Sequence, residues 1–235
     1  MFDDKKVMIF DLDGTLIDTL GIWNGIDHDV IEAAGAVPST NIQTDRERFL
    51  ANHVTGNIYV EYEKYLLNKY HITMNLQDFH QLRWQISKRY LSTVVTFKPY
   101  ALEFLKLLKS KKYTLVLSTT STKATLDVYH QTNKNIFKHI DLLNFFDLIL
   151  TRDDVTFKKP HPEIYLKVLD LLKVSSNDCL VFEDSLVGIQ SAQAADIDVV
   201  NIYDQYNSKD QNMINSLVKY PKMDYKKLIK ILNYR

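Results

Sequence analysis

The fold is decided by the stretch Lys6-Val7-Met8-Ile9-Phe10-Asp11-Leu12-Asp13-Gly14-Thr15, near the start of the chain. Its apolar run, residues 7–10, is too short to span a membrane and suits a strand buried on both faces, as in a parallel sheet. Positions i and i+2 of an extended segment point the same way. Asp11 and Asp13 are therefore expected beyond the carboxyl end of this strand, where open parallel sheets bind their ligands.

The two carboxylates of this stretch predict a metal site. Two acids held together repel each other unless a cation or a shared proton offsets the charge. A catalytic metal bound near Asp11 and Asp13 satisfies that requirement. The competing interpretation is a solvated turn, because Asp and Gly are common turn residues.

Size and composition limit the class of protein. A chain of 235 residues holds one large α/β domain, or one such domain and a small insert. Its 29 Lys and Arg balance 29 Asp and Glu, so no global field recruits nucleic acid or an anionic membrane. The first four residues are acidic where a secretory signal is basic, and no stretch approaches about 20 apolar residues. With Cys179 as the single cysteine, we expect a cytoplasmic protein without disulfides.

The apolar spacing divides the chain into a helical insert and an α/β core. Helical patterns run over 16–36, 48–70 and 76–91, and this region has almost no strand signal. From Lys98 onward, strands alternate with helices, which predicts a parallel sheet with right-handed crossovers. These strands are expected at 113–117, 146–150, 179–182 and 199–203. We expect an α/β core domain of residues 1–17 and 96–235, and a helical cap domain of residues 18–95.

Polar clusters follow three of these later strands. The second core strand ends in Ser118-Thr119-Thr120-Ser121, whose hydroxyls and backbone N–H groups suit phosphate oxygens. Lys158-Lys159-Pro160 follows the third strand, and Glu183-Asp184 closes the fourth. Each cluster is a weak signal alone, whereas four strand-end motifs in this order are specific.

Taken together, these motifs resemble those of the haloacid dehalogenase-like (HAD) hydrolases. Residues 11–19 resemble the family's first motif almost letter for letter, and Thr119 matches the Ser or Thr of the second. Residues 153–163 resemble the third motif, with its Lys before Pro, and residues 181–188 resemble the fourth. The resemblance spans residues 7–203 and implies a Rossmann-like core with a helical cap, near phosphoglycolate phosphatase and β-phosphoglucomutase.

The resemblance also implies a reaction, the hydrolysis of a phosphate monoester through an aspartyl phosphate. Asp11 would attack phosphorus, and Asp13 would act as general acid and base. Thr119 and Lys159 would bind the transferring phosphoryl group, with Thr120 as a further phosphate contact. Mg²⁺ would be bound by Asp11, Asp13 through its carbonyl, Glu183 and Asp184. The expected substrate is a small phosphorylated metabolite, and the expected state is a monomer or weak dimer.

Several positions leave alternatives open. Ser118 competes with Thr119, while Lys158 and Asp196 stand where the family usually has Gly. Another alternative is a β-phosphoglucomutase-like sugar phosphomutase, which needs a cationic cap group for a second phosphate. The matching cap positions here are Trp23 and Gly56, which favours a hydrolase.

Other cap cations could replace the missing group, and the candidates are Lys64, Lys69 and Arg83. The alternative from another class is a non-catalytic pseudo-enzyme that binds a phosphorylated ligand or a protein. It is disfavoured because no catalytic residue of the motifs is missing.

Overall fold

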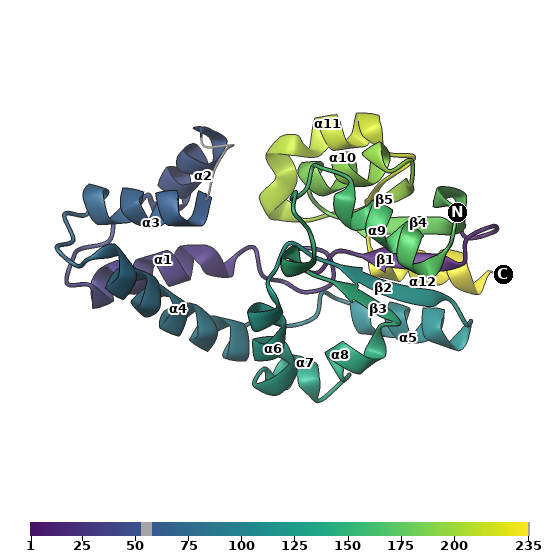
Figure 1. The fold of residues 1–235 in the computed structure, drawn as a ribbon, viewed down its shortest axis with the longest axis horizontal. Coiled ribbons are helices and arrows are strands. Elements are labelled where there is room, and N and C mark those ends of the chain that lie inside the picture. Colours follow the sequence, from purple (N-terminus) through teal and green to yellow (C-terminus); the bar gives the residue numbers. More distant parts are fainter. Residues whose placement is uncertain (53–57, 235) are drawn as a thin grey trace. The chain divides into compact units, whose positions relative to one another are not determined.

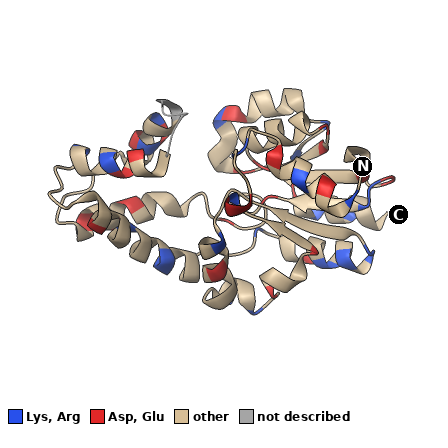
Figure 2. Cartoon of the chain, viewed as in Figure 1, with Lys and Arg blue, Asp and Glu red and all other residues tan. Residues whose placement is uncertain are grey.

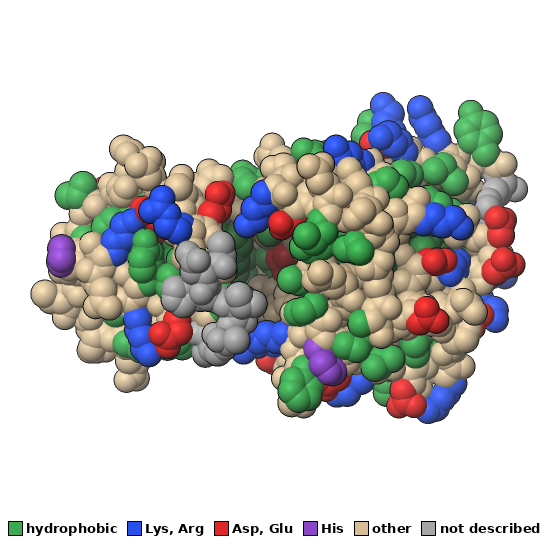
Figure 3. Space-filling model, turned by 90° about the horizontal axis from the view of Figure 1, so that it is seen from above, with side chains coloured by type: hydrophobic (Ala, Val, Ile, Leu, Met, Phe, Trp, Pro, Cys, Tyr) green, Lys and Arg blue, Asp and Glu red, His purple; other side chains and the backbone are tan. Residues whose placement is uncertain are grey.

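The protein divides into two compact units in a computed structural model that describes residues 1–52 and 58–234. The first unit comprises Met1–Leu20 and Val95–Arg235, and the second is Gly21–Val94. No helix in the described part of the chain is both long enough and apolar enough to cross a membrane. Acidic and basic side chains both occur on the helices of each unit (Figure 2). They are likewise interspersed on the face shown in Figure 3, as expected for a chain without net charge.

The first unit is built on a six-stranded parallel sheet in the order β3-β2-β1-β4-β5-β6 (Figure 1). The strands are β1 (Val7–Phe10), β2 (Thr114–Ser118), β3 (Leu148–Leu150), β4 (Cys179–Glu183), β5 (Asp198–Ile202) and β6 (Tyr220–Met223). Val7 lies opposite Thr114 on one side and Cys179 on the other, so β1 is central. Because all five pairings are parallel, the carboxyl ends of the strands meet at one edge.

Helices cover both faces of this sheet. On one face lie α9 (Glu163–Leu172), α10 (Leu186–Ala194) and α11 (Gln211–Leu217); on the other lie α5 (Ala101–Ser110) and α12 (Tyr225–Asn233) (Figure 1). Three shorter helices follow β2: α6 (Lys123–Gln131), α7 (Lys134–Phe137) and α8 (Leu142–Phe145). Short 3-10 turns occupy Arg152–Asp154, Ser176–Asp178 and Gln205–Asp210.

Successive side chains of β1 point to opposite faces of the sheet, so they pack into the core layers on both sides. Val7 and Ile9 belong to the cluster formed with α9, α10 and α11. On the opposite face, Phe10 stacks on Phe182 with ring centroids 4.4 Å apart, and Phe104 of α5 packs edge-on against both. The prediction of a strand buried on both faces is confirmed, and the two layers hold the end of β1 in place.

The second unit consists of four helices in its described residues, 21–52 and 58–94. They are α1 (Ile22–Ala33), α2 (Ile42–Asn52), α3 (Ile58–Lys69) and α4 (Leu76–Thr93). The buried stripe of α1 includes Ile22, Ile26 and Val30, which recur at helical spacing. Asn75 caps α4 by accepting a hydrogen bond from the backbone N–H of Asp78.

The structure corrects three predicted elements. The helix expected to start at Leu16 begins at Ile22, because Ile17 instead forms a β-bridge with Phe97. The stretch 48–70, predicted as one helical pattern, contains the end of α2 and all of α3, and Gly56 lies outside the described residues. The prediction also missed β6, a short strand at the sheet edge whose side chains are half-buried or exposed.

Candidate active site

The predicted site residues from three strands converge at the carboxyl edge of the sheet. Asp11 directly follows β1, Thr119 directly follows β2, and Glu183 is the last residue of β4. Since β1 lies between β2 and β4, these three ends are neighbours. The loop between β3 and α9 adds Lys159 to the same place, as its contacts show.

Lys159 joins the ends of β1, β2 and β4. Its Nζ donates to Asp11 Oδ1 at 2.8 Å, to Glu183 Oε1 at 2.7 Å and to the Ser118 carbonyl at 3.0 Å. The Lys159 side chain is only 2% exposed. Burial disfavours its ammonium, yet the carboxylates of Asp11 and Glu183 hold the pKa of Lys159 well above its usual value. Lys159 is therefore a fixed cation at the centre of the site.

The loop that carries Lys159 is itself anchored. The Glu163 carboxylate accepts hydrogen bonds from the backbone N–H groups of Thr156 and Phe157, at 2.9 Å and 2.7 Å. Lys158, which replaces the usual glycine, is half-buried in this loop, and burial lowers its pKa with help from nearby Arg152. The departure at Lys158 thus leaves Lys159 in contact with Asp11.

Both oxygens of the Asp184 carboxylate accept hydrogen bonds. Thr15 Oγ1 donates to its Oδ1 at 2.6 Å, and Asn207 Nδ2 donates to its Oδ2 at 2.6 Å. Behind it stands Gly14 with φ of +83°, where an added Cβ would lie 2.4 Å from Asp184 Oδ2. Glycine is required at this turn because both the backbone conformation and the close carboxylate exclude a side chain.

Gly188 has a similar function beside the other acid of the fourth motif. An added Cβ at Gly188 would lie 1.9 Å from Glu183 Oε1. The group that Gly188 accommodates is therefore the Glu183 carboxylate. Ser185, the N-cap of α10, also donates to Glu183 Oε2 at 3.1 Å.

The acids of this site carry more negative charge than Lys159 can balance. Asp11, Glu183 and Asp184 are buried and each offers an oxygen within 4.8 Å of the others. Burial, reinforced by the nearby Glu183 and opposed by Lys159, raises the pKa of Asp11 to about 8. Burial likewise holds the pKa of Asp184 well above its usual value. Three carboxylates beside one ammonium leave an excess of two negative charges when ionised, so the cluster fits a divalent cation that prefers oxygen ligands.

Asp13 occupies a different environment. Its Oδ2 accepts from Ser121 Oγ at 2.6 Å, and its Oδ1 accepts from the Tyr129 hydroxyl at 3.4 Å. Burial raises the pKa of Asp13, while the Ser121 bond is the strongest effect opposing that rise. The cluster formed by Asp11, Glu183 and Asp184 includes no oxygen of the Asp13 carboxylate. If Asp13 binds the metal, it would therefore do so through its backbone carbonyl, as the family resemblance implies.

The hydroxyl cluster after β2 is divided between buried and exposed residues. Thr119 is buried, and its Oγ1 accepts from the Ser121 backbone N–H at 3.0 Å. Ser118 is also buried, and its hydroxyl has no hydrogen-bond partner. Thr120 is exposed. The assignment of phosphate contacts to Thr119 and Thr120 stays a prediction.

Two residues of the site were not predicted from the sequence. Tyr129 lies on α6 and is buried, and Asn207 belongs to the 3-10 turn after β5. Neither residue stands in a motif or directly at the end of a strand. Their contacts to Asp13 and Asp184 depend on how loops return to the sheet edge, which the local spacing does not reveal.

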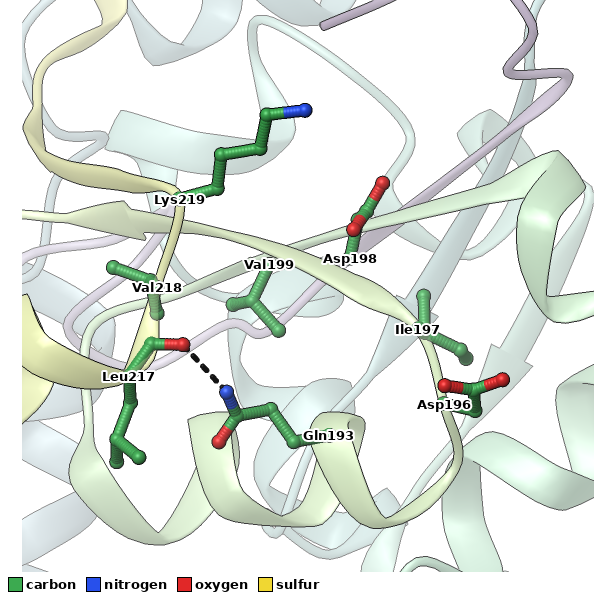
Figure 4. A pocket seen from close by; sticks show the side chains of 8 residues that line it. All are labelled: Gln193, Asp196, Ile197, Asp198, Val199, Leu217, Val218 and Lys219. Atoms are coloured by element: carbon green, nitrogen blue, oxygen red, sulfur yellow. Dashed lines mark hydrogen bonds between the residues drawn. The ribbon is translucent and has the colours of Figure 1, made fainter.

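A pocket of about 330 Å³ lies at the other edge of the sheet (Figure 4). Its lining consists of Gln193, Asp196, Ile197, Asp198, Val199, Leu217, Val218 and Lys219. Asp198 and Val199 are the first residues of β5, so the pocket opens at the amino end of a strand whose carboxyl end faces the acids. None of the predicted site residues lines it.

Comparison with known sequences agrees with this geometry. The model of the family described as haloacid dehalogenase-like hydrolase matches residues 8–202. The phosphorylated carbohydrates phosphatase of Thermotoga maritima is 29% identical over 194 residues, covering 82% of each chain. Protein CbbY of Rhodobacter capsulatus is 27% identical over 211 residues, covering 88% of this chain and 89% of its own.

Solved structures show the same fold. A proposed β-phosphoglucomutase from Thermotoga maritima aligns with a TM-score of 0.79 at 24% identity, over 97% of this chain and 99% of its own. CbbY from Rhodobacter sphaeroides, solved in complex with phosphate, aligns with a TM-score of 0.64 at 21% identity, over 87% of this chain and 88% of its own. The Rossmann-like α/β fold and the hydrolase class predicted from the motifs are confirmed. The chain belongs to the haloacid dehalogenase-like hydrolase family.

Proposed function

We propose that this family member, a phosphatase, hydrolyses the phosphate monoester of a small phosphorylated metabolite with the help of Mg²⁺. The observation that carries the proposal is the buried excess of negative charge around Asp11, Glu183 and Asp184, beside a nearly inaccessible Lys159. Such a cluster is costly unless a cation completes it. When bound by Asp11, Asp184 and the Asp13 carbonyl, Mg²⁺ would neutralise charge on the acids and on the phosphoryl group.

In the proposed reaction, Asp11 attacks phosphorus while the bond between phosphorus and the leaving oxygen breaks. Lys159 lies 2.8 Å from Asp11 Oδ1 and supplies positive charge to the phosphoryl oxygens, with Thr119 and Thr120 as further contacts. Asp13 gives its proton to the leaving oxygen. It then takes a proton from the water that hydrolyses the aspartyl phosphate, which frees phosphate and restores Asp11.

The surroundings of Asp13 support its assignment as the general acid and base. Its raised pKa favours the protonated form that a leaving group needs. Ser121 and Tyr129 contact different oxygens of the carboxyl group, which restricts its rotation. Burial also raises the pKa of Asp11, to about 8, and the positive charge of Lys159 opposes that rise and so favours the carboxylate form that a nucleophile needs.

The proposed substrate is a small phosphorylated carbohydrate. The relative from Thermotoga maritima carries the name of a phosphatase for such compounds, which supports this class. We propose that the helical unit, residues 21–94, serves as a cap that selects the substrate. The boundaries of this unit lie within three residues of those predicted for the cap, residues 18–95.

The contacts inside the helical unit favour a hydrolase over a mutase. A mutase needs a cation for a second phosphate, yet the candidate cations are already paired there. Arg83 donates to the fully buried Asp27 at 3.0 Å, Lys69 pairs with Asp45, and Lys64 pairs with Glu61 at 2.9 Å. Trp23 contributes a ring without charge, and the Arg83 guanidinium lies over it at 5.8 Å.

A panel of phosphate monoesters tests the proposal. Enzyme with Mg²⁺ is incubated with glucose 1-phosphate and with other sugar phosphates, while free phosphate and isomerised sugar phosphate are measured separately. We expect steady phosphate release that EDTA abolishes and Mg²⁺ restores, without a need for a sugar bisphosphate. Full activity in metal-free buffer would contradict the metal site, and isomerisation faster than phosphate release would establish a mutase instead.

A further inference from the structure

The segment that follows β5 returns to the acid cluster and contacts it through Asn207. The Asn207 Nδ2 group donates to Asp184 Oδ2 at 2.6 Å and to the Asp184 backbone carbonyl at 3.3 Å. Both partners are acceptors, so the amide must present its nitrogen to them. One side chain therefore binds both the carboxylate and the backbone of the same acid.

Asn207 completes a two-sided support for the Asp184 carboxylate. Thr15 donates to Oδ1 at 2.6 Å, and Asn207 donates to Oδ2 at the same distance. Donors on different oxygens fix the rotation of the carboxylate plane. Each oxygen has two lone-pair sites, so each keeps the capacity to bind a cation. Asn207 does this without adding charge, whereas a lysine there would compete with the cation.

A buried ion pair holds the segment that carries Asn207. Lys98 Nζ lies 2.5 Å from Asp204 Oδ2, and the side chains are only 11% and 5% exposed. The other oxygen of Asp204 accepts from the Tyr206 backbone N–H at 2.8 Å, and the Asp204 carbonyl accepts from the Asn207 N–H. The 3-10 turn therefore starts from a fixed point. Lys98 and Asp204 make no hydrogen bond to Asp184, although the positive charge of Lys98 also acts on that acid.

We propose that Asn207 is a positioning residue that sets the affinity of the site for Mg²⁺ by orienting Asp184. The Lys98–Asp204 pair supports it by holding the turn in place. Hydrogen bonds to ligating carboxylates orient them and tune metal affinity, which is the function assigned to Asn207. This inference rests on the proposed function, because it takes Asp184 to be a Mg²⁺ ligand.

Calorimetric titration with Mg²⁺ tests the proposal directly. The wild-type protein is compared with Asn207→Ala and with the control Asn212→Ala, which changes an exposed asparagine on α11. We expect Asn207→Ala to weaken Mg²⁺ binding by about 10- to 100-fold. We expect its melting temperature in EDTA to change little. Asn212→Ala should match wild type throughout.

Two further variants keep the test decisive if Asn207→Ala does not fold. Lys98→Met keeps the packing of the aliphatic stem but removes the charge that holds Asp204. Loss of a positive charge near Asp184 would by itself strengthen Mg²⁺ binding, so weaker binding by Lys98→Met would report the loosened turn. We expect Lys98→Met to weaken Mg²⁺ binding less than Asn207→Ala does, and we expect Lys98→Arg to keep most of the affinity.

The outcomes separate this inference from the proposed function. Equal Mg²⁺ affinity in wild type and Asn207→Ala would overturn the inference alone, and so would a lower melting temperature in EDTA with unchanged affinity. Absence of Mg²⁺ binding to the wild-type protein would overturn both the metal site and the function assigned to Asn207.

Discussion

Two buried groups of charged side chains lie in the two units of this protein, and they are balanced differently. At the sheet edge, Asp11, Glu183 and Asp184 share the single cation Lys159. In the helical unit, Asp27 is fully buried and accepts hydrogen bonds from three donors. These donors are Arg46 at 3.0 Å, Arg83 at 3.0 Å and Tyr62 at 2.8 Å.

The balance of charge distinguishes the two groups. In the helical unit, Glu63 also lies 3.9 Å from Arg83, so two acids meet two guanidinium groups and no charge is left over. At the sheet edge, two negative charges stay uncompensated when all three acids are ionised. Buried charge without a partner is strongly unfavourable. The acids at the sheet edge therefore favour either protonation or a bound cation, whereas those of the helical unit are already paired.

The largest expected effect comes from Asp11→Asn, which keeps the shape of the side chain but removes the nucleophile. We expect turnover to fall by roughly a thousandfold or more, because no aspartyl phosphate can form. Circular dichroism should show that the fold is retained. Phosphate release at near-normal rates would contradict the assignment of Asp11.

The same exchange in the helical unit should act on stability instead. Asp27→Asn removes the carboxylate that pairs with Arg46 and leaves Arg83 with only the more distant Glu63, at 3.9 Å. We expect a loss of about 3 to 5 kcal/mol in the free energy of unfolding, measured by chemical denaturation. Stability equal to wild type would show that the ion pairs with Asp27 are not structural, and the contrast between the two groups would fail.

Gly188→Ala should disturb the sheet-edge group by steric means alone. The new methyl would lie 1.9 Å from Glu183 Oε1, which pushes the carboxylate away from Lys159. We expect a loss of about 1 to 3 kcal/mol in stability, together with reduced turnover.

The matched control is Gly25→Ala in α1, where the added Cβ would meet only the Tyr90 side chain, with its hydroxyl 2.9 Å away. We expect little change, because alanine favours a helix and the end of Tyr90 can move. Equal effects of the two substitutions would contradict the special need for glycine at position 188.

Tyr129→Phe should give the smallest effect of the series. It removes one hydrogen bond to Asp13 Oδ1, worth about 1 kcal/mol, so we expect turnover to fall by about fivefold. Without that donor the pKa of Asp13 rises further, so the limb of the pH–rate profile that reports Asp13 should shift to higher pH. Tyr62→Phe, which removes a bond to Asp27, should leave that profile in place.

Asp11, Thr119 and Glu183 could be predicted because each stands at a strand end in local sequence, and Lys159 could be predicted because it precedes a proline in the loop after β3. The apolar run of β1 followed by Asp11 locates the sheet edge without any knowledge of distant contacts. Asp196 is a further case, since its φ of +59° explains why a glycine is usual at that position. Asp tolerates the left-handed conformation better than most residues do, so the departure is compatible with the fold.

The remaining features depend on contacts between distant parts of the chain. Tyr129 meets Asp13 across 116 positions, and no periodicity in α6 indicates that contact. The β6 strand contains Pro221 and exposed Lys222, a composition that reads as a loop until β5 provides a partner. The pairing of Asp27 with Arg46 and Arg83 could not be predicted from the sequence either, because the two arginines come from different helices.

Titration of metal-free protein with Mg²⁺ in two buffers of different ionisation enthalpy tests the central claim most directly. With a pKa of about 8, Asp11 is largely protonated at pH 7, and a bound cation requires its carboxylate form. We predict that Mg²⁺ binding releases protons at pH 7 and that affinity rises as the pH approaches 8. Asp184→Asn should weaken binding strongly, whereas Asp27→Asn should not. Absent binding, or heats that are equal in both buffers with affinity independent of pH between 6 and 8, would contradict the claim that a cation completes the sheet-edge group.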